Sequence, residues 1–158
     1  WPVVAALGLG GLLMVGVDRW LRRRAAGGKT LESMTLRDAL LIGCVQALSL
    51  WPGTSRAMVT IVAGLVLGLP MAAAAEYSFL LALPTLGAAI FFSAVTGAPG
   101  LAREAGALSI FCGVTAAALV AALAIRGFVR YVTRRGLAPF GWYRVGLAAI
   151  VWLVVAFP

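Results

Sequence analysis

Long apolar runs alternate with short polar segments along the whole chain. The runs cover residues 2–17, 39–50, 57–69, 71–95, 104–125 and 139–157. A helix needs about 20 mainly apolar residues to cross a bilayer, and the first, fourth, fifth and sixth runs approach or exceed that length. The pattern predicts an all-α integral membrane protein, with residues 1–158 forming a single membrane domain. Composition agrees, because 63% of the residues are hydrophobic and only 11% are charged, against about 25% charged residues in soluble domains.

The second and third runs are shorter than the others. Each is about 13 residues long, or roughly 20 Å as a helix, which is too short to cross comfortably. Two interpretations remain open: one broken span, or a re-entrant helical hairpin over residues 39–69 that returns to its own side. Non-helical backbone at membrane depth is tolerated only where it is buried in protein or lines a cavity. Either interpretation therefore places the turn between the two runs at a site.

The basic residues are concentrated in two polar segments, 18–37 and 126–136. The chain has 13 Lys and Arg against 5 Asp and Glu, a net charge of +8. In a membrane chain this pattern favours cytoplasmic loops near anionic lipid headgroups, and no nucleic-acid partner is expected. If both segments are cytoplasmic, residues 39–69 must contribute an even number of crossings, which favours the hairpin. The turn at 97–103 and the C-terminus would then lie outside.

The polar turn reads Trp-Pro-Gly-Thr-Ser-Arg over residues 51–56. Pro52 and Gly53 break the helix and leave backbone N–H groups free. Arg56 offers a guanidinium that binds phosphate oxygens in a bidentate manner, although an arginine that snorkels to the interface is the alternative. Thr54 and Ser55 are expected to donate to phosphate, or one of them to act as a nucleophile. Their structural alternative is to cap the following helix.

Two further polar residues flank the turn. Thr60 lies one helical turn after Arg56 and either follows the ligand site or bonds back to helix carbonyls. Gln46 lies in the preceding apolar run and either orients a ligand or bonds another helix. The chain has no histidine and no paired carboxylates near the turn, so we expect no metal ligands here.

A longer set of residues resembles a known family. Gln46-Ala-Leu-Ser-Leu-Trp-Pro-Gly-Thr-Ser-Arg56, Gly64, Leu67-Gly68 and Tyr77-Ser-Phe-Leu-Leu-Ala-Leu-Pro84 are similar to the C-terminal half of the undecaprenyl-diphosphatase (bacitracin-resistance) family. The family pattern usually continues Ser-Arg-Ser-Gly-Ala-Thr. Here the corresponding stretch is Ser-Arg-Ala-Met-Val-Thr, residues 55–60, so one hydroxyl and one glycine are absent.

The resemblance implies an enzyme of the bacterial inner membrane that hydrolyses undecaprenyl diphosphate to undecaprenyl phosphate and inorganic phosphate, and so recycles the lipid carrier of cell-wall synthesis. It implies Mg²⁺ or Ca²⁺ as cofactor, an inverted repeat with two re-entrant hairpins, and a site that opens to the outer side. Arg56 and Ser55 would be catalytic. The expected substrate-binding residues are Gly53, Thr54, Thr60 and Gln46.

The family's first-half motif, with two glutamates and a histidine, has no counterpart in these residues. We therefore expect that this chain is a fragment that begins at or inside a helix, that it carries half of the site, and that it is inactive alone. The ligands of the cation are expected in the other half. A homodimer is one assembly that the sequence leaves open.

Two other functional classes remain as alternatives. A transporter or lipid-flipping protein also uses broken helices, and its arginine would bind an anionic headgroup. A non-catalytic paralogue or assembly subunit would fit the departure at Ala57 and Met58.

Overall fold

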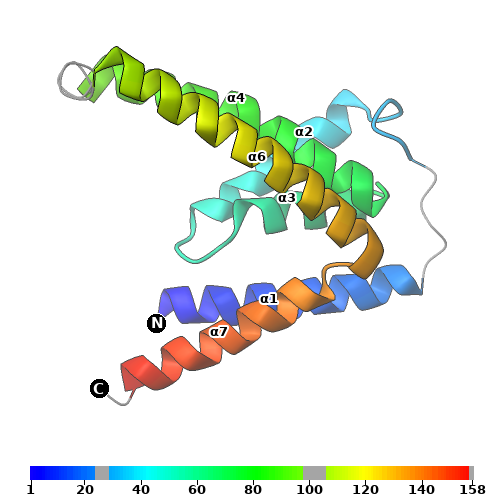
Figure 1. The fold of residues 1–158 in the computed structure, drawn as a ribbon. Coiled ribbons are helices and arrows are strands. Elements are labelled where there is room, and N and C mark those ends of the chain that lie inside the picture. Colours follow the sequence, from blue (N-terminus) through cyan, green and yellow to red (C-terminus); the bar gives the residue numbers. More distant parts are fainter. Residues whose placement is uncertain (24–28, 98–105, 157–158) are drawn as a thin grey trace.

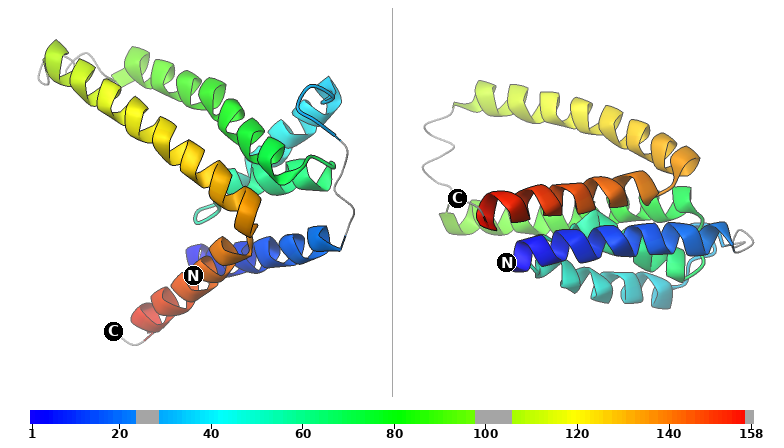
Figure 2. Two further views of the ribbon diagram at one scale, coloured as in Figure 1. Left: turned by 45° about the vertical axis from the view of Figure 1, so that its right-hand side comes forward. Right: turned by 90° about the horizontal axis from the view of Figure 1, so that it is seen from below.

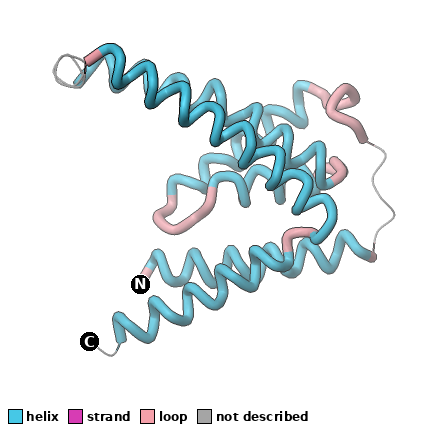
Figure 3. Tube along the Cα trace, in the orientation of Figure 1, coloured by secondary structure: helices cyan, strands magenta, loops and turns pink. Residues whose placement is uncertain are grey.

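The computed structural model describes residues 1–23, 29–97 and 106–156, and these residues are helical with short connections (Figures 1 and 3). No strand occurs among them, which confirms the all-α class. The helical elements are α1 Pro2–Arg22, α2 Leu36–Gln46, the 3₁₀ turn η1 Ala47–Leu50, α3 Arg56–Val66, α4 Met71–Gly97, α6 Ala107–Arg135 and α7 Ala138–Ala156.

The helices form two groups. Helices α1 and α7 lie side by side, while α2, α3, α4 and α6 pack together on the other side, as the views of Figures 1 and 2 show. Glycines bring α1 and α7 into close contact, since a Cβ atom on Gly11 would lie 2.6 Å from the carbonyl oxygen of Gly141. Small residues at such a crossing allow the backbones of membrane helices to approach each other.

The best-buried core joins the hairpin of α2 and α3 to helix α4. Ile42 of α2, Ile61 of α3 and Ala75 of α4 have at most 1% of their surface exposed. Gly64 of α3 also packs closely on α4, because a Cβ atom there would lie 3.2 Å from the Cβ of Ala74. The hairpin is thus held firmly against α4, which fixes the position of the turn at its tip.

Among the described residues, four helices are long and apolar enough to cross a membrane: Pro2–Arg22, Met71–Ser93, Leu108–Arg135 and Ala138–Ala156. Most of the large apolar side chains of α6 are exposed; Leu123, for example, is 68% exposed. Exposure of this extent suits contact with lipid or with another apolar surface. The chain is a multi-pass membrane protein.

The expected loops at 18–37 and 126–136 are shorter than predicted. Helix α1 continues to Arg22 and helix α6 to Arg135. Within α1, Asp18 and Arg22 form an i,i+4 ion pair with 2.8 Å between Oδ2 and Nε. The arginines at the ends of both helices also interact favourably with the helix dipole. These local interactions extend the helices into the basic segments.

The two basic segments meet at one end of the molecule. Nη2 of Arg22 donates to the carbonyl oxygen of Arg135 at 3.1 Å. Oδ1 of Asp18 accepts from the backbone N–H of Leu137 at 2.8 Å, and Gly136 turns the chain between α6 and α7 with φ +77°. The buried Asp18 carboxylate therefore ties α1 to this connection. The side of the membrane on which the segments lie stays a prediction.

The predicted hairpin is present as two antiparallel helices. Both its ends lie near the basic segments, and the turn at residues 51–55 lies at the opposite end, near the N-terminus (Figure 1). This arrangement has the shape that re-entry requires, while re-entry into a bilayer stays a prediction. The predicted turn at 97–103 lies almost wholly outside the described residues.

The first arm begins with a well-formed cap. The Thr35 hydroxyl accepts from the backbone N–H of Asp38, and the Asp38 carboxylate accepts from the backbone N–H of Thr35 at 3.1 Å. The ammonium of Lys29 also donates to this carboxylate at 3.2 Å. These hydrogen bonds, with that of the Thr35 backbone the largest, hold the pKa of Asp38 below its ordinary value of 3.8.

Candidate functional site

The turn that precedes α3 is a tight β-turn. The N–H of Thr54 donates to the carbonyl oxygen of Trp51 at 3.0 Å, and Gly53 has φ +88°. Proline at the second position and a positive-φ glycine at the third are typical of a type II turn, which is the order of Pro52 and Gly53. A Cβ atom on Gly53 would also lie 2.9 Å from the carbonyl oxygen of Val3 in α1. Glycine is therefore required here by both conformation and space.

Ser55 caps helix α3. Its backbone is extended, with φ −80° and ψ 122°, and its Oγ accepts from the N–H of Met58 at 3.4 Å. The capping role that the sequence left open is thus present. The hydroxyl keeps its own proton, so Ser55 can still donate to a ligand. The N–H groups of Arg56 and Ala57 belong to the first turn of α3, where backbone donors lack partners within the helix.

Arg56 is the first residue of α3, and its side chain is half-buried against α4. Nη1 donates to Oγ1 of Thr85 at 2.8 Å. The ion pairs among the described residues involve only Asp18 and Asp38, so no carboxylate neutralises Arg56 there. An arginine that extends into solvent would not make this contact with another helix. A guanidinium held in this way still presents a positive charge and unused N–H donors.

Thr60 faces α4 and not the turn. Its Oγ1 lies 2.6 Å from Oγ of Ser78 in a buried pair, and it also donates toward the carbonyl oxygens of Arg56 and Ala57 at 3.0 and 3.2 Å. These contacts match the structural alternative, so a substrate role for Thr60 stays a prediction. Gln46 ends α2, with η1 between it and the turn. Among the described residues, the structure gives its side chain no hydrogen-bond partner.

Sequence reasoning did not assign a role to Arg144. This α7 residue donates from Nη2 to the carbonyl oxygen of Gly53 at 2.9 Å. Its Nε is buried and has no hydrogen-bond partner among the described residues. A Cβ atom on Gly10 would lie 3.2 Å from Nη2, so the guanidinium fits closely against α1. The sequence feature that could have identified Arg144 is its charge, because an ionisable residue inside an apolar span indicates a functional site by default.

Two hydroxyls of α4 were also missed. Ser78 contacts Thr60 and Thr85 contacts Arg56, which places a short polar strip between α3 and α4. The partners are four residues apart on α3 and seven apart on α4, so each pair lies along one helix face. The spacing was visible in the sequence, but the register between the two helices was not.

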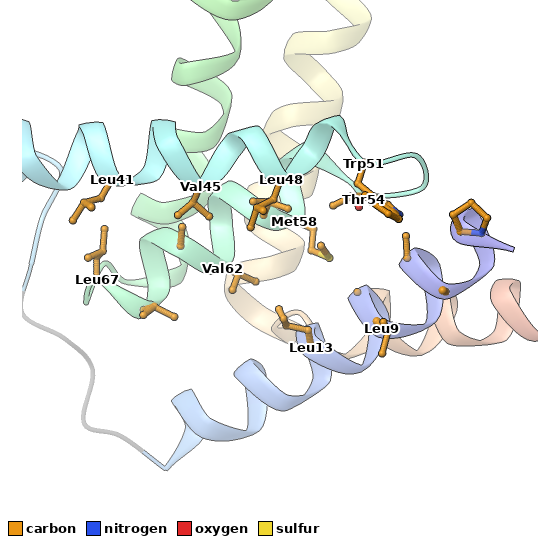
Figure 4. Close-up of a pocket in the computed structure, with 17 residues that line it drawn as sticks. Leu9, Leu13, Leu41, Val45, Leu48, Trp51, Thr54, Met58, Val62 and Leu67 are labelled. Atoms are coloured by element: carbon orange, nitrogen blue, oxygen red, sulfur yellow. The ribbon is translucent and has the colours of Figure 1, made fainter.

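An apolar pocket of about 780 Å³ lies beside the turn, between α1, α2 and α3. Figure 4 shows its walls, which are lined by Leu9 and Leu13 of α1, Leu41 and Val45 of α2, Val62 of α3, and Leu67 directly after α3. Trp51 and Thr54 of the turn line it as well. The pocket is thus apolar along its length and meets polar groups where it reaches the turn.

The turn is a poor place for a metal. The side chains gathered there carry hydroxyls and guanidinium groups, whereas Mg²⁺ and Ca²⁺ prefer carboxylates and other oxygen ligands. Within the described ranges there is also no cluster of three or more Cys, Asp or Glu residues that could hold an ion. The residues at the turn do not fit a divalent cation, and the turn is suited instead to an anion.

Comparisons with known proteins agree on one family. A family model described as "Bacitracin resistance protein BacA" matches residues 1–150. A protein of Sorangium cellulosum named undecaprenyl-diphosphatase is 52% identical over 155 residues. Proteins with the same name from Rhizorhabdus wittichii and Nitrosomonas europaea are 43% and 41% identical.

Each of these alignments covers 96% of this chain but a smaller share of the relative. The shares are 50% of the Sorangium cellulosum protein, 57% of the Rhizorhabdus wittichii protein and 55% of the Nitrosomonas europaea protein. The chain therefore spans about half the length of the curated relatives it matches.

Proposed function

The chain belongs to the family of the bacitracin resistance protein BacA, and on that premise we propose that it takes part in the hydrolysis of undecaprenyl diphosphate to undecaprenyl phosphate and inorganic phosphate. The observation that carries the proposal is the placement of Arg56. It lies on a Pro-Gly turn at the start of a helix, its charge is not neutralised by a carboxylate within the described residues, and one neutral hydrogen bond holds it in place.

In this proposal the turn binds the diphosphate. The guanidinium of Arg56 contacts phosphate oxygens, because its fork of N–H donors matches their geometry. The free N–H groups at the start of α3 add donors and the positive end of the helix dipole. The hydroxyls of Ser55 and Thr54 complete the set. Arg144 holds the turn in shape by donating to the carbonyl oxygen of Gly53.

The chemical role of Arg56 follows from the reaction. Hydrolysis breaks the bond between the terminal phosphorus and the bridging oxygen, so negative charge develops on the bridging oxygen and is spread over the phosphoryl oxygens. A fixed cation next to these oxygens stabilises the transition state more than the ground state. Arg56 supplies this cation, and Ser55 donates a hydrogen bond through the proton that its capping role leaves free.

The apolar pocket is the proposed place of the prenyl chain. It lies next to the turn, its walls are aliphatic, and Thr54 and Trp51 mark the end where the pocket meets the polar groups. A lipid diphosphate needs this combination of an anion site and an adjoining apolar channel. A water-soluble diphosphate gains nothing from the pocket and is expected to bind more weakly.

The remainder of the site is proposed to lie outside this chain. The divalent cation that the family resemblance implies does not fit the residues at the turn, so its ligands would come from another half of the enzyme. We expect residues 1–158 alone to be inactive, and we place the protein in the bacterial inner membrane with the turn accessible from the outer side.

A hybrid protein tests this function. Residues 1–158 replace the matching segment of the Sorangium cellulosum relative, which is 52% identical, and the hybrid is reconstituted into liposomes with Mg²⁺. We expect it to release phosphate from undecaprenyl diphosphate, and residues 1–158 alone to release none.

The same liposomes distinguish the alternatives. Movement of a labelled polyprenyl phosphate across the bilayer without phosphate release would support a transporter. A folded hybrid that neither hydrolyses nor moves the lipid would support a non-catalytic paralogue, and either result would overturn the proposed hydrolysis.

A further inference from the structure

Helix α4 presents two hydroxyls to helix α3, and only one of them reaches a charged group. Ser78 pairs with Thr60, so both members of that pair are neutral. Thr85 lies two helical turns further along α4 and meets the guanidinium of Arg56 at 2.8 Å. The Thr85 contact is therefore the one that bears directly on the proposed anion site.

The orientation of the Thr85 hydroxyl is fixed by its own helix. Oγ1 lies 2.9 Å from the carbonyl oxygen of Leu81 and 3.2 Å from that of Ala82, and its proton is donated in that direction. A threonine hydroxyl has one proton and two lone pairs. With the proton engaged, a lone pair faces Arg56, so Thr85 acts only as an acceptor toward the guanidinium.

A neutral acceptor has a specific advantage for an anion-binding arginine. It occupies one of the five N–H donors and leaves the other four, together with the full positive charge, for a ligand. A carboxylate in the same place would hold the side chain equally well but would compete with phosphate for the cation. The described residues place no carboxylate in an ion pair with Arg56.

We propose that Thr85 is a positioning residue for Arg56: it fixes one edge of the guanidinium against α4 so that the remaining donors are already oriented when the phosphate arrives. The inference rests on the proposed function for the identity of the ligand. Without the acceptor, the arginine must be ordered during binding, and a misplacement of about 1 Å in such a group reduces rates by as much as about 100-fold.

The first test uses the 158-residue chain itself in detergent micelles. NMR of ¹⁵N-labelled arginine measures how fast the Nη hydrogens of Arg56 exchange with water. We expect Thr85→Val, which keeps the shape and removes the acceptor, to speed this exchange about 10-fold, the factor that corresponds to loss of one hydrogen bond of about 1.4 kcal/mol. Thr85→Ser restores the hydroxyl and should retain slow exchange.

Thr115→Val is the matched control. The Thr115 hydroxyl donates to the carbonyl oxygen of Phe111 at 2.8 Å, in the same way as Thr85 bonds its own helix, but it is exposed and bonds no arginine. Equal exchange at Arg56 in the Thr85→Val and Thr115→Val proteins would overturn the positioning role. The comparison needs no enzyme activity, so it stands apart from the proposed hydrolysis.

The second test is kinetic and uses the hybrid protein. Thr85→Val should lower kcat about 10-fold, while Thr85→Ser and Thr115→Val stay within about 2-fold of the parent. In an Arg56→Lys background the Thr85→Val change should have little further effect, because the group that it positions is gone. An equal loss in both backgrounds would show that Thr85 acts independently of Arg56 and would contradict the inference.

The two tests separate the possible failures. A hybrid that releases no phosphate, together with faster exchange in Thr85→Val, overturns the hydrolysis and supports the contact between Thr85 and Arg56. A hybrid that is active, with no difference between Thr85→Val and Thr115→Val, supports the hydrolysis and overturns the positioning role.

Discussion

Asp18 is the residue whose loss is expected to disturb the arrangement of α1 and α7 most clearly. Asp18 is 3% exposed, and each carboxylate oxygen has one partner: Oδ1 accepts from the backbone N–H of Leu137, and Oδ2 accepts from Nε of Arg22, both at 2.8 Å. The substitution Asp18→Ala removes both acceptors. The matched substitution Asp18→Asn keeps a carbonyl oxygen that can face Leu137 and removes the charge.

The expected loss of stability in Asp18→Ala comes mainly from the buried backbone N–H of Leu137. Leu137 is 1% exposed, so its N–H group has little access to water once Asp18 is removed. An unsatisfied buried donor costs about 1–3 kcal/mol. The ion pair with Arg22 adds little, because that side chain is 64% exposed and solvent screens it. We therefore expect Asp18→Ala to lower the free energy of unfolding by about 1–3 kcal/mol, and Asp18→Asn by much less.

Thermal unfolding in detergent, followed by tryptophan fluorescence at neutral pH, measures the difference. For chains of this size, 1 kcal/mol corresponds to a shift in Tm of about 2–4 °C. Asp18→Ala should then lower Tm by about 2–12 °C. A Tm equal to that of the parent would refute the reasoning, and so would an Asp18→Asn variant as unstable as Asp18→Ala, because the amide would not be the source of the loss.

Three further results are expected. Because the pKa of Asp38 is lowered in the folded state, its carboxylate stabilises the fold above pH 3.8, and this contribution is lost as the pH falls through the lower pKa of the folded state. The decrease in Tm on acidification should therefore be smaller in Asp38→Asn than in the parent. Gly53→Ala should destabilise the turn by at least about 1 kcal/mol, measured as urea-induced unfolding, because its φ is positive and the new Cβ would press on Val3. Cysteines placed at Glu32 and Arg134, in a background without Cys44 and Cys112, should both react with a membrane-impermeant maleimide from the cytoplasmic side only; labelling from opposite sides would contradict the shared location of the basic segments.

The sequence predicted the features that depend on local chemistry. Apolar runs located the membrane helices, and the Pro52-Gly53 pair located the turn, because proline and glycine are favoured at the two central positions of a type II turn. The short arms predicted two helices on either side of that turn, and α2 and α3 are found there. Each of these features is determined within a few residues of chain.

Features that depend on contacts between distant residues were not predicted. Asp18 was assigned to a loop, because its partner Leu137 is 119 residues away and nothing near Asp18 indicates that contact. Thr85 was assigned no role, since its hydrogen bond with Arg56 depends on the register in which α4 packs against α3. Arg144 could have been singled out by its charge within an apolar span, but its partner, a backbone carbonyl of the turn, leaves no trace in the sequence.

Arg56 has the central role in the proposed phosphate site, and one measurement tests that role directly. Phosphate release from undecaprenyl diphosphate is compared in the hybrid protein, its Arg56→Ala and Arg56→Lys variants, and an Arg126→Ala control that removes an exposed arginine of α6. We expect Arg56→Ala to lower kcat about 10²–10³-fold, the loss typical of removing one donor that stabilises a transition state, with Arg56→Lys intermediate and the control unchanged. Release by Arg56→Ala within a few-fold of the parent would contradict the assignment of the turn as the phosphate site.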